Sequence, residues 1–226
     1  MKRIAMFAAV MAMVVLTAPE AMALLTPISS APSGELSLDT SGGILDMLYG
    51  LSNLQRISDS FAGDQLWEVS AAAASVTVVA KFAGFSQNFG VIPGSSGGTL
   101  ALLLTQVATV DPTGPSAGSG LSANLPLLTG EFRFGDDPSG APLWSSLQSD
   151  NSDGGLDHMV TWRILGTGDY VVAFEDLTHL GDRDYNDLVV QVHGAHPATP
   201  EPGTLLLIGA GLVGIGVGAR RRGRGK

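Results

Sequence analysis

Apolar residues recur at two different spacings along the chain. Over residues 43–57 they follow helical spacing, at Ile44, Leu45, Leu48, Leu51, Leu54 and Ile57. This pattern predicts one short helix near the N-terminus that packs its apolar side on the core. Gly50 lies inside this segment and weakens the helix by about 1 kcal/mol relative to alanine.

From Gln65 onward the apolar pattern is that of strands. Alternate positions share one face in three late segments, namely Val160, Trp162 and Ile164; Tyr170, Val172 and Phe174; and Leu188, Val190 and Val192. Short strands with turns about every 8–12 residues, and little helix, are typical of antiparallel sandwiches. The sequence therefore predicts a mainly β fold, an antiparallel β-sandwich or jelly roll.

The two ends of the chain have a different pattern. An unbroken apolar run over residues 4–16 follows Lys2 and Arg3, and Ala21-Met22-Ala23 provides a small-x-small cleavage pattern. Together they predict a signal peptide over residues 1–23. At the other end, Pro200-Glu201-Pro202 precedes an uncharged apolar run over residues 203–219 and a basic cluster. That run reaches the lower limit of length for a membrane-spanning helix.

The C-terminal pattern resembles the PEP-CTERM sorting signal. The resemblance implies an exported protein of a Gram-negative bacterium, recognised by an exosortase during a transient stay in the inner membrane and often linked to exopolysaccharide or biofilm production. A plain tail anchor is the alternative. We expect residues 24–64 to form an N-terminal linker and helix, 65–195 the β-sandwich domain, and 196–226 the sorting signal with its transmembrane segment.

Charge is concentrated in the central part of the chain. Nineteen of the 21 acidic residues, but only five of the 12 basic residues, lie between residues 24 and 199, so this part has a formal charge near −14. Such a charge argues against nucleic acid or anionic lipid as a partner and favours cation binding. Because the chain has no cysteine, disulfides and thiolate chemistry are excluded.

The acidic residues are densest over residues 175–187, which we expect to form the loop of a β-hairpin. The oxygen donors there are Glu175, Asp176, Asp182, Asp184, Asn186 and Asp187. Such a set suits Ca²⁺, which takes six to eight oxygens at about 2.3–2.6 Å. It is not an EF-hand, because Asp187 and His193 stand where that loop requires Gly and Glu. A solvated acidic loop is the alternative.

A second acidic turn lies over residues 150–157. Gly154 and Gly155 permit the positive φ angles of a tight loop. Each acidic loop precedes a predicted strand, so both can lie at one end of the sandwich. We therefore expect Asp153 and Asp157 to reach the same ion, with ordinary Asx turns as the alternative.

A further resemblance rests on Asp153-Gly154-x-x-Asp157-His158, on residues 174–177 and on residues 181–190, with weaker similarity over residues 64–67 and 85–90. These segments resemble the domain of unknown function 4114 of exported bacterial proteins. The resemblance implies a β-rich extracellular domain that binds calcium through the acidic residues of the 175–187 loop and has no established activity.

The histidines have no zinc-site spacing, and no phosphate loop occurs. We expect a cell-surface or matrix protein, not an enzyme, whose partner is an extracellular polysaccharide or another envelope polymer. The alternative function is a polysaccharide hydrolase that pairs Glu175 or Asp176 with Asp157. A purely structural surface or adhesive protein, with solvated acidic loops, is a third possibility.

Overall fold

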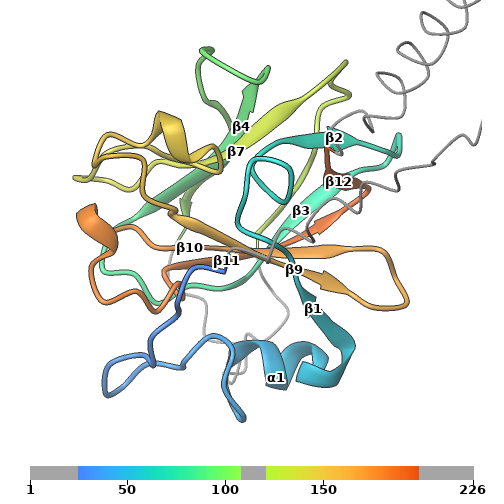
Figure 1. The fold of residues 1–226 in the computed structure, drawn as a ribbon. Helices are drawn as coiled ribbons and strands as arrows, with labels where there is room; N and C mark the ends of the chain where they lie inside the picture. Colours follow the sequence, from blue (N-terminus) through green and yellow to red (C-terminus); the bar gives the residue numbers. More distant parts are fainter. Residues whose placement is uncertain (1–24, 108–120, 199–226) are drawn as a thin grey trace, which may run out of the picture.

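The computed structural model describes residues 25–107 and 121–198. These residues form two antiparallel sheets packed face to face (Figure 1). The first sheet contains, in spatial order, β1 (Leu54–Arg56), β9 (Met159–Ile164), β10 (Tyr170–Phe174), β11 (Leu188–His193), β3 (Ser75–Ala80) and β6 (Ser122–Asn124). The second contains β12 (Ala195–Pro197), β2 (Trp67–Val69), β7 (Phe132–Asp136), β4 (Gln87–Pro93) and β5 (Ala101–Val107), and β8 (Trp144–Ser145) pairs with β7. The predicted mainly β sandwich is confirmed.

Along the central strands of the first sheet, alternate side chains point to two separate cores. On β10, Tyr170, Val172 and Phe174 pack between the sheets, whereas Val171 and Ala173 point to the opposite face of the same sheet. This second face is also buried, which is why the strand is apolar at every position. The first sheet is therefore the middle layer of the molecule.

The N-terminal segment covers the outer face of the first sheet. It contains helix α1 (Ile44–Tyr49), which lies below β9 and β1 on the side away from β4 and β7 (Figure 1). Leu38, Ile44 and Leu45 are fully buried against that face. The segment before residue 65 thus completes the second core of the sandwich.

The helix predicted over residues 43–57 is shorter in the structure. It ends at Tyr49 because Gly50 has a φ of 74° and breaks the helical hydrogen-bond pattern. A 3₁₀ turn, η1 (Leu51–Asn53), follows, and β1 then pairs with β9. The apolar residues after Gly50 keep helical spacing only because the turn and the strand both lie on the same covered face.

All described strands of both sheets lie between residues 54 and 197. Residues 24–199 therefore include the elements that form both cores, and we call this segment the fragment 24–199. The expected signal peptide, the Pro-Glu-Pro sequence, the apolar run and the basic cluster lie outside the described residues. Within the described ranges, no helix has the length and apolar character needed to cross a membrane.

Candidate metal centre

The hairpin of β10 and β11 positions the acidic loop. Phe174 pairs with Leu188 at the end of these strands, so residues 175–187 form the connection between them, as predicted. A short 3₁₀ turn, η3 (Thr178–Leu180), lies inside this loop. The loop projects from one end of the sandwich (Figure 1).

Carboxylates of the loop converge in two groups. Glu175, Asp182 and Asp184 have oxygens that all lie within 4.8 Å of one another, and the same holds for Glu175, Asp176 and Asp187. Glu175 belongs to both groups. The loop thus brings together all five predicted carboxylates, and we call them the loop cluster.

Asn186 is the remaining predicted donor of the loop, and hydrogen bonds from its side-chain amide fix its orientation. Its Nδ2 donates to Glu35 Oε2 at 3.2 Å and to the Leu36 carbonyl at 3.1 Å. Its backbone N–H donates to Asp184 Oδ1 at 3.2 Å. Its Oδ1 is buried and accepts no hydrogen bond from the described residues, so this oxygen is available to a cation.

Two oxygens of the loop cluster are buried without a partner among the described residues. Glu175 is 0% exposed, and Asp176 and Asp184 are also buried. Glu175 Oε2 and Asp184 Oδ2 accept no hydrogen bond from the described part of the chain. The ion pairs found there also leave out the whole loop cluster. Glu175 and Asp184 each have one hydrogen-bonded oxygen and one without a partner. Burying ionised carboxylates with no cation nearby costs several kcal/mol, so this arrangement favours a bound positive charge.

The pKa values of these groups reflect the same shortage of positive charge. Burial, followed by the charges of its neighbours, raises the pKa of Glu175 to about 7 and that of Asp184 to about 6. Burial and the charges of Asp176 and Glu175 raise the pKa of Asp187 to about 10. A divalent cation among these oxygens would reverse the shifts, because it stabilises the ionised forms.

The loop reaches this geometry through an unusual backbone. His179, Leu180, Arg183 and Tyr185 have φ angles of 53–62° and are the non-glycine residues with positive φ in the described chain. Such conformations cost energy and cluster at functional sites. Gly181 allows a further tight bend, since a Cβ there would lie 2.5 Å from Leu177 Cδ1. The backbone strain lies in the segment that directs Asp182 and Asp184 toward Glu175.

Two aromatic side chains fix the first part of the loop. His158 Nδ1 contacts the Glu175 carbonyl at 2.7 Å, and Trp144 Nε1 donates to the Asp176 carbonyl at 2.7 Å. The two rings stack with centroids 3.7 Å apart and an angle of 3° between their planes. The carbonyls of adjacent loop residues are thus held by one rigid, buried ring pair.

Two family models match parts of the chain. Residues 97–195 match the family model of a domain of unknown function, DUF4114, and residues 198–222 match the PEP-CTERM protein-sorting motif. Part of this chain therefore resembles the DUF4114 family. Both resemblances predicted from the sequence are confirmed. No curated protein and no solved structure matches the chain.

The two matches also bear on location and activity. The PEP-CTERM motif indicates an exported protein that is sorted to the cell envelope or surface, and it implies recognition by an exosortase. The descriptions of the two models name no catalytic activity. The DUF4114 match begins after the segments over residues 64–67 and 85–90, so those weaker similarities lie outside it.

The second acidic turn, over residues 150–157, contacts the loop but not the loop cluster. Asp153 Oδ2 accepts hydrogen bonds from His158 Nε2 at 2.9 Å and from the His179 N–H at 2.8 Å. The Asp157 carbonyl accepts a hydrogen bond from the Tyr185 hydroxyl at 2.5 Å. Neither carboxylate belongs to the two groups around Glu175. The structure therefore places both loops together but directs Asp153 and Asp157 to other partners.

Three polar side chains that were not predicted from the sequence lie beside the loop cluster, namely Asp136, Gln87 and Lys81. Asp136, at the end of β7, is fully buried, and neither of its carboxylate oxygens is hydrogen bonded to a described residue. Burial, followed by the charge of Asp176, raises its pKa well above the ordinary value. Gln87 Nε2 donates to Asp176 Oδ2, and the buried Lys81 is the nearby cation, with Asp176 as its strongest electrostatic partner. A signal for Asp136 existed, because it continues the inward alternation of Phe132 and Phe134.

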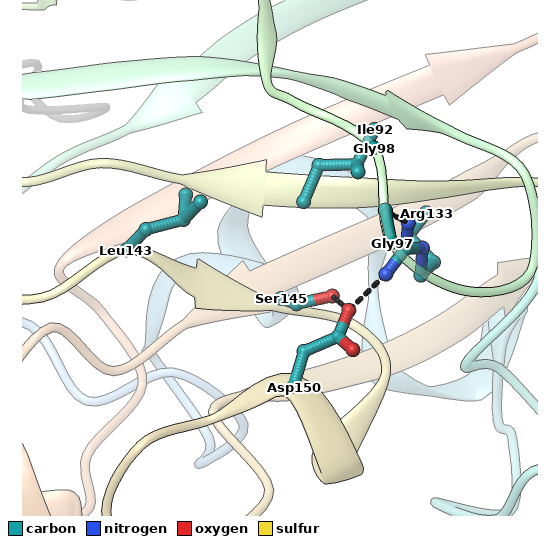
Figure 2. Close-up of a pocket in the computed structure, with 7 residues that line it drawn as sticks. All are labelled: Ile92, Gly97, Gly98, Arg133, Leu143, Ser145 and Asp150. Carbon is teal, nitrogen blue, oxygen red and sulfur yellow. Dashed lines mark hydrogen bonds and ion pairs between the residues drawn. The ribbon is translucent and has the colours of Figure 1, made fainter.

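A separate polar pocket of about 220 Å³ lies beside β7 and β8 (Figure 2). The buried Arg133 points into it and is fully engaged: its Nε donates to the Gly94 carbonyl at 3.0 Å, and its two terminal nitrogens donate to the Gly97 carbonyl and to Asp150. The guanidinium thus fastens the turn after β4 to the 3₁₀ turn η2 (Gln148–Asp150). Arg133 therefore has a structural role beside this pocket.

Proposed function

We propose that this exported DUF4114 protein binds calcium through the loop cluster, and that the bound ion fixes one end of a β-sandwich which holds an extracellular polysaccharide or another envelope polymer. One observation carries the calcium assignment. Five carboxylates converge in the loop in two groups that share Glu175, and two of their oxygens, Glu175 Oε2 and Asp184 Oδ2, are buried without any hydrogen-bond or ion-pair partner among the described residues. A bound cation supplies the missing partner for both oxygens.

The donor set favours Ca²⁺ over other metals. Every available atom is a carboxylate or amide oxygen, and such hard donors suit calcium, which accepts six to eight ligands in irregular geometry. The loop offers more oxygens than an octahedral Mg²⁺ site uses from protein. Asp182 is exposed whereas Glu175 and Asp184 are buried, so an ion can enter from the solvent side past Asp182.

Calorimetric titration of the fragment 24–199 with CaCl₂, together with melting curves, tests this proposal. Binding heat is expected, and at a calcium concentration 100 times Kd the fold should gain about 2.7 kcal/mol. For a domain of this size that gain corresponds to a rise in Tm of about 5–11 °C. Absence of both binding heat and thermal stabilisation at millimolar calcium would disprove the calcium assignment.

An open pocket of about 500 Å³ supports the polymer part of the proposal. Its lining combines one aromatic ring with amides, hydroxyls and a carboxylate: Phe61, Gln65, Gln148, Ser60, Ser149 and Asp59. Phe61 is 56% exposed. An apolar ring surface beside hydrogen-bonding side chains matches the two faces of a sugar. The acidic surface of the protein favours a neutral or cationic polymer over an anionic one.

Binding of the fragment to immobilised exopolysaccharide tests this pocket. Phe61→Ala should weaken retention by about tenfold, the equivalent of about 1.4 kcal/mol, because the ring stacking is lost. Leu127→Ala is the matched control, since Leu127 is exposed and is not a lining residue of this pocket. Equal retention of both variants and of the wild type would assign the polymer to another surface or to none.

The hydrolase alternative has less support than polymer binding. A glycosidase needs two carboxylates that contact the substrate, but Glu175, Asp176 and Asp157 are all buried.

For localisation, we further propose a Gram-negative envelope with transient anchoring in the inner membrane through residues 203–219. Fractionation should find the full-length chain in the inner membrane and a shorter form at the surface. A single uncut form in the inner membrane would favour a plain tail anchor.

A further inference from the structure

The loop cluster is divided into two ligand groups that share one side chain. Glu175, Asp182 and Asp184 form the first group, and Glu175, Asp176 and Asp187 form the second. Within each group the ligand oxygens lie within 4.8 Å of one another, which is the widest separation of two oxygens that bind one Ca²⁺ at about 2.4 Å. Asp182 and Asp184 form no such group with Asp176 and Asp187. One ion at that distance therefore contacts one group and leaves two aspartates of the other group without a metal.

The aspartates of the second group are held in place by neutral donors. Gln87 Nε2 donates to Asp176 Oδ2 at 2.5 Å, and the Asp176 N–H donates to Asp187 Oδ2 at 2.8 Å. An amide and a backbone N–H orient these carboxylates but supply no positive charge. The second group is thus arranged in advance and still lacks a counter-ion.

The nearby cation does not neutralise the second group. Lys81 is buried, and its Nζ donates to the Ala83 carbonyl at 2.9 Å. It is absent from the ion pairs formed within the described ranges. Five ionised carboxylates and the Lys81 ammonium together have a formal charge of −4. One Ca²⁺ leaves half of this charge in a largely buried site, whereas two balance it.

Further buried oxygens without a partner lie next to Asp176. Gln87 is 0% exposed, and the Oε1 of the amide that contacts Asp176 has no hydrogen-bond partner in the described part of the chain. Asp136, whose two oxygens likewise lack a described partner, pairs in register with Trp144, and Trp144 Nε1 donates to the Asp176 carbonyl. The shortage of positive charge therefore extends to the Asp176 side of the loop, which an ion in the first group does not reach.

We propose that the loop cluster binds two calcium ions, one at each group, and that Glu175 is a ligand of both. This inference rests on the calcium site proposed above and adds a second ion to it. Carboxylates bind Ca²⁺ through one or both oxygens, so Glu175 has an oxygen for each ion. The second ion joins Asp176, just after β10, to Asp187, just before β11. A proton shared by these two aspartates is the alternative, and it leaves a single bound ion.

Native mass spectrometry of the fragment 24–199 counts the bound calcium ions. We expect two in the wild type. Asp182→Asn alters only the first group and Asp187→Asn only the second, so each variant should retain one ion, because the other group keeps all three of its carboxylates. Glu175→Gln should retain none. Asp39→Asn is the matched control, since Asp39 lies outside both groups, and it should retain two.

The count separates this inference from the calcium proposal itself. A folded wild-type fragment without calcium would disprove both, whereas a single bound ion would keep the loop site and overturn the second ion. Two ions that both remain in Asp187→Asn would also overturn it, because the second ion would then lie elsewhere. If Asp187→Asn does not fold, Asp176→Asn tests the same group by the same count. Calorimetric titration measures the stoichiometry independently: two ions per chain are expected, and one would contradict the proposal.

Discussion

Replacing Glu175 with glutamine distinguishes a calcium site from an ordinary buried ion cluster. Glu175 belongs to both carboxylate groups of the loop cluster. Its Oε1 accepts the Leu177 N–H at 3.2 Å, and its Oε2 has no hydrogen-bond partner among the described residues. Glutamine keeps the shape and the Oε1 acceptor, and its amide can donate to the neighbouring carboxylates. We therefore expect the variant to fold.

The size of the effect without metal follows from the pKa of Glu175. Burial and the charges of neighbouring aspartates raise this pKa from 4.5 to about 7. A tenfold change in proton affinity corresponds to about 1.4 kcal/mol, so at pH 8 the ionised side chain destabilises the metal-free fold by about 3 kcal/mol. Glu175→Gln removes this penalty. The Tm of the metal-free fragment should rise by about 6–12 °C, at about 2–4 °C per kcal/mol for a domain of this size.

Calcium should reverse the order of the melting temperatures of the wild-type fragment and the Glu175→Gln variant. The wild type gains about 2.7 kcal/mol at a calcium concentration 100 times Kd, whereas the variant has lost the ligand shared by both groups and should gain little from the loop site. A substitution that raises the Tm without metal and lowers it relative to the wild type with calcium would identify Glu175 as a calcium ligand.

Melting curves at pH 8 in EDTA and in millimolar CaCl₂ measure both effects. Glu68→Gln is the matched control, because Glu68 is half-buried on β2 in the other sheet and lies outside the loop cluster. It should change neither Tm nor the calcium response. A Glu175→Gln fragment that melts below the wild type in EDTA, or that keeps the full calcium response, would refute the argument.

Two further predictions follow from the loop. Because the folded pKa of Glu175 and Asp184 lies near 7 and 6, above the unfolded values, the metal-free fold binds more protons than the unfolded chain. The contribution of these two groups to the stability of the metal-free fold is therefore fully present below about pH 4, and it should be lost as pH rises to 7. Saturating calcium should remove most of this loss in melting curves measured across the pH range. A metal-free fold that gains stability between pH 4 and pH 7 would contradict the assignment. Gly181→Ala places a Cβ 2.5 Å from Leu177 Cδ1 and should weaken calcium binding by about 10–100-fold in calorimetry, whereas Gly84→Ala, which meets no atom within 4 Å, should not; equal affinities would show that the bend is dispensable.

The strands and the hairpin loop were predictable because their signals are local. Period-two alternation over residues 170–174 and 188–192 follows from strand geometry alone. The helix near the N-terminus was predicted too long, because spacing does not reveal that Gly50 takes a positive φ. The apolar residues after it have the same spacing whether they form a helix or, as here, a turn and β1.

The sequence by itself determined the fold class, the sorting motif and the acidic loop, since each depends on residues close together in the chain. Only the tertiary structure decided which oxygens meet. It placed Asp136 in the interior, separated Asp157 from the loop cluster, and joined Asp157 to Asp59 through Thr26. Those contacts depend on strand pairing between distant segments, and the distance between two carboxylates after folding is set by that pairing and not by their separation in sequence.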